Sequence, residues 1–154
     1  MQLEKTISQY ESELRKCRDV FQKKTKDYGT SWRVLRPSSL TDQLFIKAQR
    51  IRTIEENKAQ KVEEGVESEF IGLVNYAIIG LIQLKMNDNT NLDLSEHEAL
   101  THFDAESKAI QELMLAKNHD YGEAWRDMRV SSFTDLILMK LLRIRQIEDN
   151  QGKT

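Results

Sequence analysis

The chain contains a long internal repeat. Residues 24–58 align with residues 117–151 without a gap, at a constant offset of 93, and 18 of the 35 positions are identical. Both copies contain the pattern Lys-x-x-Asp-Tyr-Gly followed by Trp-Arg, at 24–33 and at 117–126. Chance does not produce such agreement over one continuous stretch, so we infer an internal duplication. The chain must therefore fold as two related halves.

The two copies differ in length. After the shared region the first copy continues into an apolar segment at 67–86, whereas the sequence ends at Thr154, where the counterpart of this segment would begin. We therefore expect the second copy to lack its last helix. This would leave an apolar groove that a partner chain covers, or a loose second half. The expected organisation is a single domain, 1–154, with repeats 1–86 and 95–154 and a polar linker at 87–94.

The pattern of apolar residues predicts helices. They recur at steps of three and four in five segments. Gly29 predicts a left-handed end to the first helix, and Ser39 with Asp42 and Ser95 with Glu98 predict capping boxes at two helix starts. The chain has only 6 Gly and 1 Pro, which argues against a turn-rich all-β fold. The expected fold is an all-α helical bundle of about five helices, with approximate bounds 3–24, 39–57, 67–86, 95–117 and 132–150.

Charge and cysteine content limit the classes of partner. The 23 basic and 25 acidic residues give a formal charge of −2, so nucleic acid is not expected as a bulk electrostatic partner. Cys17 is the single cysteine, which excludes an intrachain disulfide and fits a reduced, cytoplasmic setting. The longest apolar stretch, 70–84, is interrupted by Asn75 and is shorter than a bilayer requires, so no membrane association is expected.

Basic and hydroxyl side chains surround the start of one helix in each copy. A helix N-terminus offers free amide groups and the positive end of its dipole, and arginine binds phosphate through two parallel hydrogen bonds. The pattern predicts a phosphate or nucleotide site in each copy. The alternative, which the sequence leaves open, is that these cations pair with Asp27, Asp42, Glu55 and their counterparts. The candidate residues are Lys24, Arg33, Arg36, Ser38, Ser39, Lys47, Arg50, Lys117, Arg126, Arg129, Ser131, Ser132, Lys140 and Arg143.

Acidic residues and a polar residue mark the third predicted helix. Glu63 and Glu67 are four residues apart, and carboxylate oxygens suit Mg²⁺ bound next to a phosphate; alternatively, they favour the helix dipole. Asn75 lies in an apolar run and must find hydrogen-bond partners, either in the loop around Trp32 or on a nucleobase. Trp32 and Trp125 either pack in the core or stack on a ring.

These motifs resemble the nucleotide-modification-associated domain 1 family, also catalogued as domain of unknown function 1599. The likeness rests on the doubled Lys-x-x-Asp-Tyr-Gly and Trp-Arg units, the Lys47-x-x-Arg50 spacing, and an acidic lead into Asn75-Tyr76-Ala77. It implies a link to modified-nucleotide metabolism without an assigned reaction. The helical layout is also loosely similar to MazG-like all-α nucleotide pyrophosphohydrolases, which hold Mg²⁺ at a triphosphate with paired carboxylates. Gly72 stands where relatives often have another Asp, and the second predicted helix has no inward Glu-x-x-Glu pair.

We therefore expect a protein that binds a nucleotide or a phosphate-containing small molecule, with Mg²⁺ as the candidate cofactor. One alternative is a non-catalytic helical module that forms a homo-oligomer. A second is a Mg²⁺-dependent nucleotide pyrophosphohydrolase. The sequence does not decide whether the protein is an enzyme, and it assigns no catalytic residue.

Overall fold

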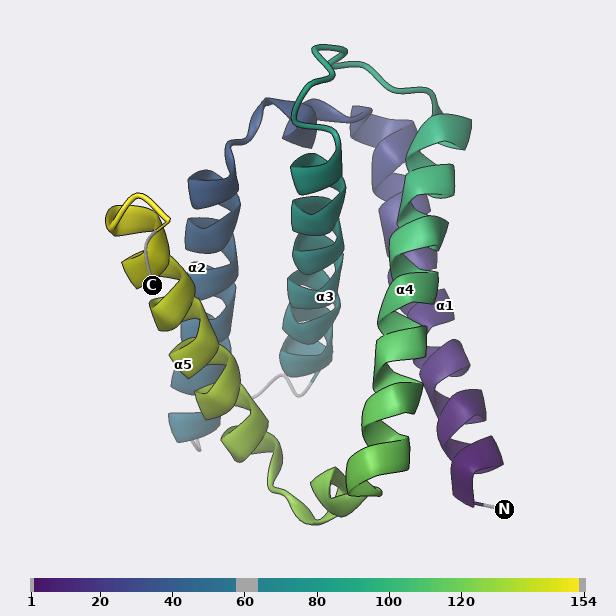
Figure 1. Cartoon of the computed structure of the whole chain (residues 1–154), viewed down its shortest axis with the longest axis vertical. Helices are drawn as coiled ribbons and strands as arrows, with labels where there is room; N and C mark the ends of the chain where they lie inside the picture. The colour runs from purple at the N-terminus through teal and green to yellow at the C-terminus, as the bar shows by residue number, and fades with distance from the viewer. Residues whose placement is uncertain (1, 58–63, 153–154) are drawn as a thin grey trace.

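The computed structural model describes residues 2–57 and 64–152. Within these residues it contains five α-helices, two short 3₁₀ helices and no strand (Figure 1). The expected all-α bundle is thus confirmed. The elements are α1 (Gln2–Tyr28), η1 (Ser31–Val34), α2 (Pro37–Glu56), α3 (Glu64–Lys85), α4 (Glu96–Tyr121), η2 (Ala124–Asp127) and α5 (Val130–Asp149).

The element bounds recur with the sequence repeat. The unit α1–η1–α2 and the unit α4–η2–α5 share every internal boundary at the offset of 93, from the end of the first helix to the end of the second. The two units run in opposite directions: α1 leads to η1 at one end of the molecule, and α4 leads back to η2 at the other end (Figure 1). In the described part of the chain, α3 has no counterpart in the second unit.

Helix α3 occupies the middle of the molecule, between α2 and the pair formed by α1 and α4 (Figure 1). One core cluster joins α1, α3 and α4, and in it the ring centroids of Phe21 and Phe103 are 4.7 Å apart. A second cluster joins α2 and α5 to Leu73 of α3. Because α5 packs mainly on α2, α2 connects the second unit's last helix to the rest of the bundle.

Helices α2 and α5 meet through reciprocal hydrogen bonds. The Thr41 hydroxyl donates to Glu148 at 2.8 Å, and the Thr134 hydroxyl donates to Glu55 at 3.1 Å. Thr41 and Thr134 are equivalent repeat positions, and so are Glu55 and Glu148. The same contact is therefore made twice with the roles exchanged, as in an isologous interface between two subunits.

Ion pairs at the α2–α5 interface follow the same rule. Arg52 lies 3.7 Å from Asp135, and Arg145 lies 3.9 Å from Asp42. The arginines are equivalent repeat positions, and the aspartates are equivalent as well. The two helices thus pack antiparallel about a local pseudo-two-fold axis inside one chain.

The helix ends confirm two predicted signals and correct a third. Ser95 and Glu98 form the predicted capping box of α4, and Gly29 ends α1 with a φ of 70°, although the helix runs past the expected end at residue 24. The predicted capping box at Ser39 and Asp42 was wrong, because α2 already begins at Pro37 and its N-cap makes no side-chain hydrogen bond. Proline suits the first helical position, where its fixed φ matches the helix and no N–H is needed.

Residues Val66–Lys85 of α3 are long and apolar enough, by length and composition, to cross a membrane. This segment is longer than the apolar stretch 70–84 considered from the sequence. The central helix of a soluble bundle meets the same criterion, and Ile78 and Ile82 of α3 are each only 1% exposed inside the bundle.

Candidate functional site

A pocket of about 970 Å³ opens beside the first Lys-x-x-Asp-Tyr-Gly motif. Its walls come from the C-terminal part of α1, from η1, and from the face of α3 that turns toward them, with one residue, Lys47, from α2. Its volume lies in the range of small-molecule sites, which are mostly apolar with a few placed polar groups. We call it the first-repeat pocket. Its lining residues include Phe21, Lys24, Trp32, Lys47, Glu67, Glu69, Gly72, Asn75 and Tyr76.

Local sequence explains how the α1 and η1 walls form. Val20, Lys24 and Tyr28 follow one another at steps of four and so share a face of α1, and all three line the pocket. Gly29 then adopts a left-handed φ, which few other residues tolerate, and the turn brings Trp32 back against the same pocket. The spacing of the motif therefore places Lys24, Tyr28 and Trp32 around one pocket in the first copy.

A glycine on α3 makes room for the lysine from α2. A Cβ built on Gly72 would lie 3.5 Å from Nζ of Lys47, and no side chain separates the two. From there the ammonium group reaches 5.2 Å from the ring centroid of Tyr76, a distance suited to a cation–π contact. The space beside Gly72 is thus occupied by the stem and head of Lys47.

The charges at the pocket differ in how they are compensated. In the described part of the chain, neither Lys24 nor Lys47 has a carboxylate within ion-pair distance. Glu67 lies 3.4 Å from Lys16, and Glu69 lies 3.4 Å from Arg50. The pocket therefore holds two cations without an acidic partner beside two carboxylates that are already paired.

Asn75 brings an unpaired hydrogen-bond acceptor to the pocket wall. The residue is 7% exposed, and its Nδ2 donates to the carbonyl of Cys17 at 3.0 Å. Its Oδ1 is buried and has no hydrogen-bond partner among the described residues. A buried acceptor left unpaired costs about 1–3 kcal/mol. The Asn75 carbonyl oxygen is thus an unsatisfied acceptor on a residue that lines the pocket.

The loop around Trp32 is held by Gln83 of α3 and not by Asn75. Nε2 of Gln83 donates to the carbonyl oxygens of Trp32, Arg33 and Leu35, at 2.8 to 3.2 Å. The sequence motifs do not single out Gln83. The signal was present, because Gln83 lies eight residues after Asn75 in the same apolar helix, and the same argument about buried amides applies to both.

Arg33 has a structural role instead of a ligand-binding one. It is 7% exposed, and its guanidinium donates to Gln83 and to the carbonyl oxygens of Asn89 and Asn91. These acceptors belong to α3 and to the linker that follows it. The side chain therefore ties η1 to both segments, and it does not line the first-repeat pocket.

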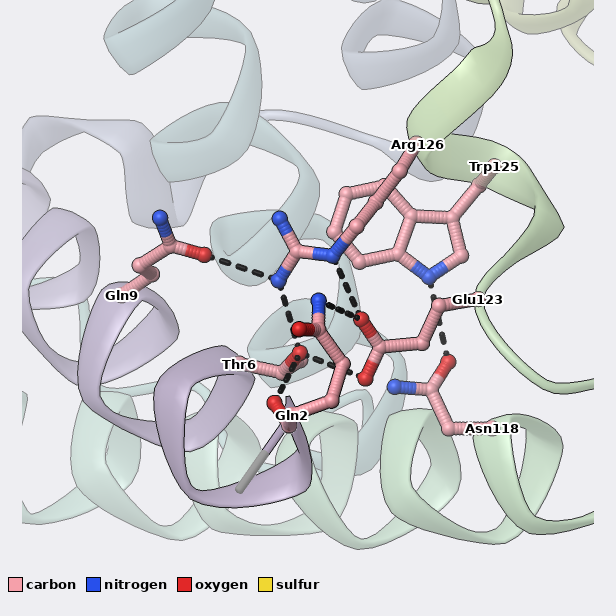
Figure 2. Close-up of polar contacts among 7 residues, drawn as sticks. All are labelled: Gln2, Thr6, Gln9, Asn118, Glu123, Trp125 and Arg126. Atoms are coloured by element: carbon pink, nitrogen blue, oxygen red, sulfur yellow. Dashed lines mark hydrogen bonds and ion pairs between the residues drawn. The ribbon is translucent and has the colours of Figure 1, made fainter.

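Arg126, the counterpart of Arg33, makes different contacts (Figure 2). Its Nε donates to Glu123 at 2.5 Å, and its Nη2 donates to Thr6 and Gln9 of α1. The guanidinium also lies 4.6 Å from the ring centroid of Trp125. In the second copy, this arginine therefore docks the start of α1 onto η2.

The same network fixes the charge of Glu123. The ion pair with Arg126, together with hydrogen bonds from Thr6 and Gln2, lowers the pKa of the Glu123 carboxyl from 4.5 to about 2. Each of these groups stabilises the ionised form. Glu123 thus stays charged at any pH near neutrality.

Most of the remaining candidates lie away from the pocket. Arg36 is the N-cap of α2 and Ser38 and Ser39 lie in its first turn, and none of the three lines the first-repeat pocket. Of the acidic pair, Glu67 lines the pocket, whereas Glu63 lies outside the described residues. No group of three or more metal-ligating side chains was found in the described ranges. In the second copy, Lys117, Arg129, Ser131, Ser132, Lys140 and Arg143 also lie outside the first-repeat pocket.

Comparison with known proteins gives one match. A family model described as nucleotide modification associated domain 1 matches residues 24–84 and 117–154, which is more than half of the chain. The two matched segments begin at equivalent positions of the repeat, and the first includes nearly all of α3. No significant match was found among curated proteins or among solved structures.

Proposed function

The chain belongs to the nucleotide modification associated domain 1 family, and from this premise we propose that it binds a nucleotide in the first-repeat pocket. The observation that carries the proposal is the meeting of three features in one pocket. These are two cations without acidic partners, an aromatic wall, and the unpaired carbonyl oxygen of Asn75.

Each feature suits one part of a nucleotide. Lys24 and Lys47 supply positive charge for phosphate oxygens. Trp32 supplies an aromatic surface on which a base can stack. Oδ1 of Asn75 accepts a hydrogen bond from an N–H group of the base, and this bond removes the cost of leaving that oxygen buried and unpaired.

Mg²⁺ enters the proposal as a bridge to phosphate. This ion is usually held by one or two carboxylates together with substrate phosphate oxygens. Glu67 lines the pocket, and its pairing with Lys16 joins two exposed side chains, so the pairing is weak and easily exchanged. Glu67 would hold the ion, while Glu69 stays with Arg50.

A thermal-shift titration tests the proposal. Nucleoside mono-, di- and triphosphates are compared with nucleosides and inorganic phosphate, each with and without Mg²⁺. We expect the nucleotides to raise Tm more than nucleosides or inorganic phosphate, because a nucleotide contacts more of the pocket and binds with a lower Kd. A ligand present at 100 times its Kd stabilises the folded state by about 2.7 kcal/mol. Pyrophosphate release measured on the same samples separates binding from hydrolysis.

The repeat supplies a matched control. Lys47→Met removes a pocket cation, and Lys140→Met removes the lysine at the equivalent position of α5, which does not line the pocket. We expect Lys47→Met to reduce the nucleotide-induced shift and Lys140→Met to leave it unchanged. The proposal fails if no nucleotide raises Tm, or if both variants lose the shift equally.

A further inference from the structure

The outer face of α5 carries an exposed apolar stripe. Leu136, Met139 and Leu142 follow one another at steps of three and are 40%, 57% and 46% exposed. Helix α5 lies at one edge of the molecule with α2 on its inner side (Figure 1). We call these three residues the α5 stripe.

The first copy shows what this face looks like when it is more polar. The repeat positions that correspond to the α5 stripe are Gln43, Ile46 and Gln49 of α2. Leucines on α5 thus stand where α2 has glutamines. A surface helix normally presents polar side chains to water, so two leucines in place of two glutamines in one copy only indicate a partner on that copy.

Two residues of the stripe border a groove. A hollow of about 470 Å³ is lined by Met139 and Leu142, with Asp135 and Arg143 among its polar residues. In helical projection, Asp135 and Arg143 lie on opposite sides of Met139, four residues before and four after it. The apolar stripe is therefore flanked by one acidic and one basic residue, placed symmetrically about its centre.

We propose that a second copy of this chain covers the α5 stripe, with the two α5 helices packed antiparallel about a two-fold axis at Met139. In this arrangement Leu136 faces Leu142 of the second copy, and Met139 faces its own equivalent. Asp135 faces Arg143 of the second copy, and this ion pair forms twice. The face is thus complementary to itself in the placement of its apolar residues and in charge, as an isologous contact requires.

The chain already makes an antiparallel pairing of this kind. Inside one molecule, α2 and α5 join through reciprocal arginine–aspartate pairs, one of which is Arg52 with Asp135 at 3.7 Å. The side chains of that pair are 48% and 62% exposed, so it is weak in water and leaves Asp135 able to contact a second cation. Because the contact centres on one helix from each copy, we expect an interface below about 1,200 Å², which gives a reversible dimer that depends on concentration.

Sedimentation velocity over a rising concentration series tests the proposal on the full chain. The wild-type mass should rise from one chain toward two, and Met139→Glu should remain monomeric. Two controls place the same charge elsewhere on the molecule, at positions about as exposed as Met139. They are Ile46→Glu, at the equivalent position of α2, and Leu84→Glu, on α3, and both positions are 58% exposed. Both controls should dimerise like the wild type.

A charge exchange tests the register without altering the stripe. In the Arg143→Asp variant, an aspartate faces Asp135 of the second copy at both symmetric contacts. This repulsion should weaken association at least about tenfold, which corresponds to about 1.4 kcal/mol. Adding Asp135→Arg together with Arg52→Gln, which removes the cation that lies 3.7 Å from Asp135 inside the chain, restores opposite charges across the contact and should restore dimerisation. Circular dichroism confirms that each variant keeps its helices.

Three outcomes would overturn the proposal. The first is a wild-type protein that stays monomeric over the whole series. The second is a loss of dimer in Ile46→Glu or Leu84→Glu as large as that in Met139→Glu, because the contact would then lie elsewhere. The third is a charge exchange that fails to restore association, because the helices would then not pair about Met139.

Discussion

Arg33 and Arg126 show that one residue type at one repeat position can have two roles. Arg33 is buried, and three oxygen acceptors surround its guanidinium, two of them from the linker. The Arg126 side chain is 26% exposed and pairs with Glu123. The surroundings therefore decide the role: Arg33 contacts α3 and the linker, whereas Arg126 contacts α1 and Glu123.

The two arginines should differ in their contribution to stability. Arg33→Ala leaves buried oxygen atoms without their donor and should lower the free energy of unfolding by about 3 kcal/mol. Arg126→Ala removes a partly exposed ion pair and should cost about 1 kcal/mol. Urea denaturation of both variants measures the difference. Equal losses would mean that burial does not separate the two sites.

Glu123 should make stability depend on pH at acid values. Its pKa is lowered from 4.5 to about 2 in the folded protein, so the folded state binds fewer protons than the unfolded state between these values. The stabilisation is fully present above pH 4.5 and is lost as the pH falls toward 2. We expect Glu123→Gln to be less stable than the wild type above pH 4.5, with the difference shrinking toward pH 2. A difference that stays constant with pH contradicts the ion-pair origin.

At the same scale, the sequence identified part of the pocket. Lys24, Lys47 and Glu67 were predicted as binding residues and do line one pocket, because helical spacing and the repeated motif place them near the same turn. Two of the three acceptors of Arg33 were not predictable. They are backbone carbonyl oxygens of the linker, and backbone acceptors leave no signature in the residue types.

At the scale of elements, the main asymmetry is the position of α3. It packs on α2, where Ile51 is fully buried, whereas the equivalent Ile144 of α5 is 42% exposed. The helices themselves were predictable from apolar periodicity, which depends only on local sequence. The start of α2 and the short helices η1 and η2 were not, because proline chemistry and tertiary contacts set them.

Alanine substitutions at the equivalent positions 51 and 144 measure how much the packing of α3 on α2 contributes to the free energy of unfolding. Ile51→Ala removes buried methyl groups beside Leu73 of α3 and should cost about 2–5 kcal/mol. Ile144→Ala changes a side chain that is already partly in water and should cost under about 1 kcal/mol. Thermal and urea unfolding report both values. A large loss in Ile144→Ala would show that α5 is covered in solution by something besides α2.

At the scale of the whole molecule, stability should be uneven. Helix α3 contacts α1, α2 and α4, whereas α5 lies at the edge and packs mainly on α2 (Figure 1). Elements with fewer buried contacts open at lower free energy than the global unfolding reaction. The second repeat should therefore open through α5 while the first repeat, with its pocket, stays folded.

Native-state hydrogen exchange tests this order. At low protein concentration, the amides of α5 should exchange with a smaller opening free energy than the central amides of α3, because α5 can detach from α2 without disturbing the cluster around Phe21 and Phe103. Met139→Glu serves as the control, since it blocks the proposed dimer contact and should remove any extra protection of α5 at high concentration. Equal opening free energies for α3 and α5 would mean that the two units unfold together, and that the reciprocal contacts of Thr41 and Thr134 bind α5 as firmly as the core holds α3.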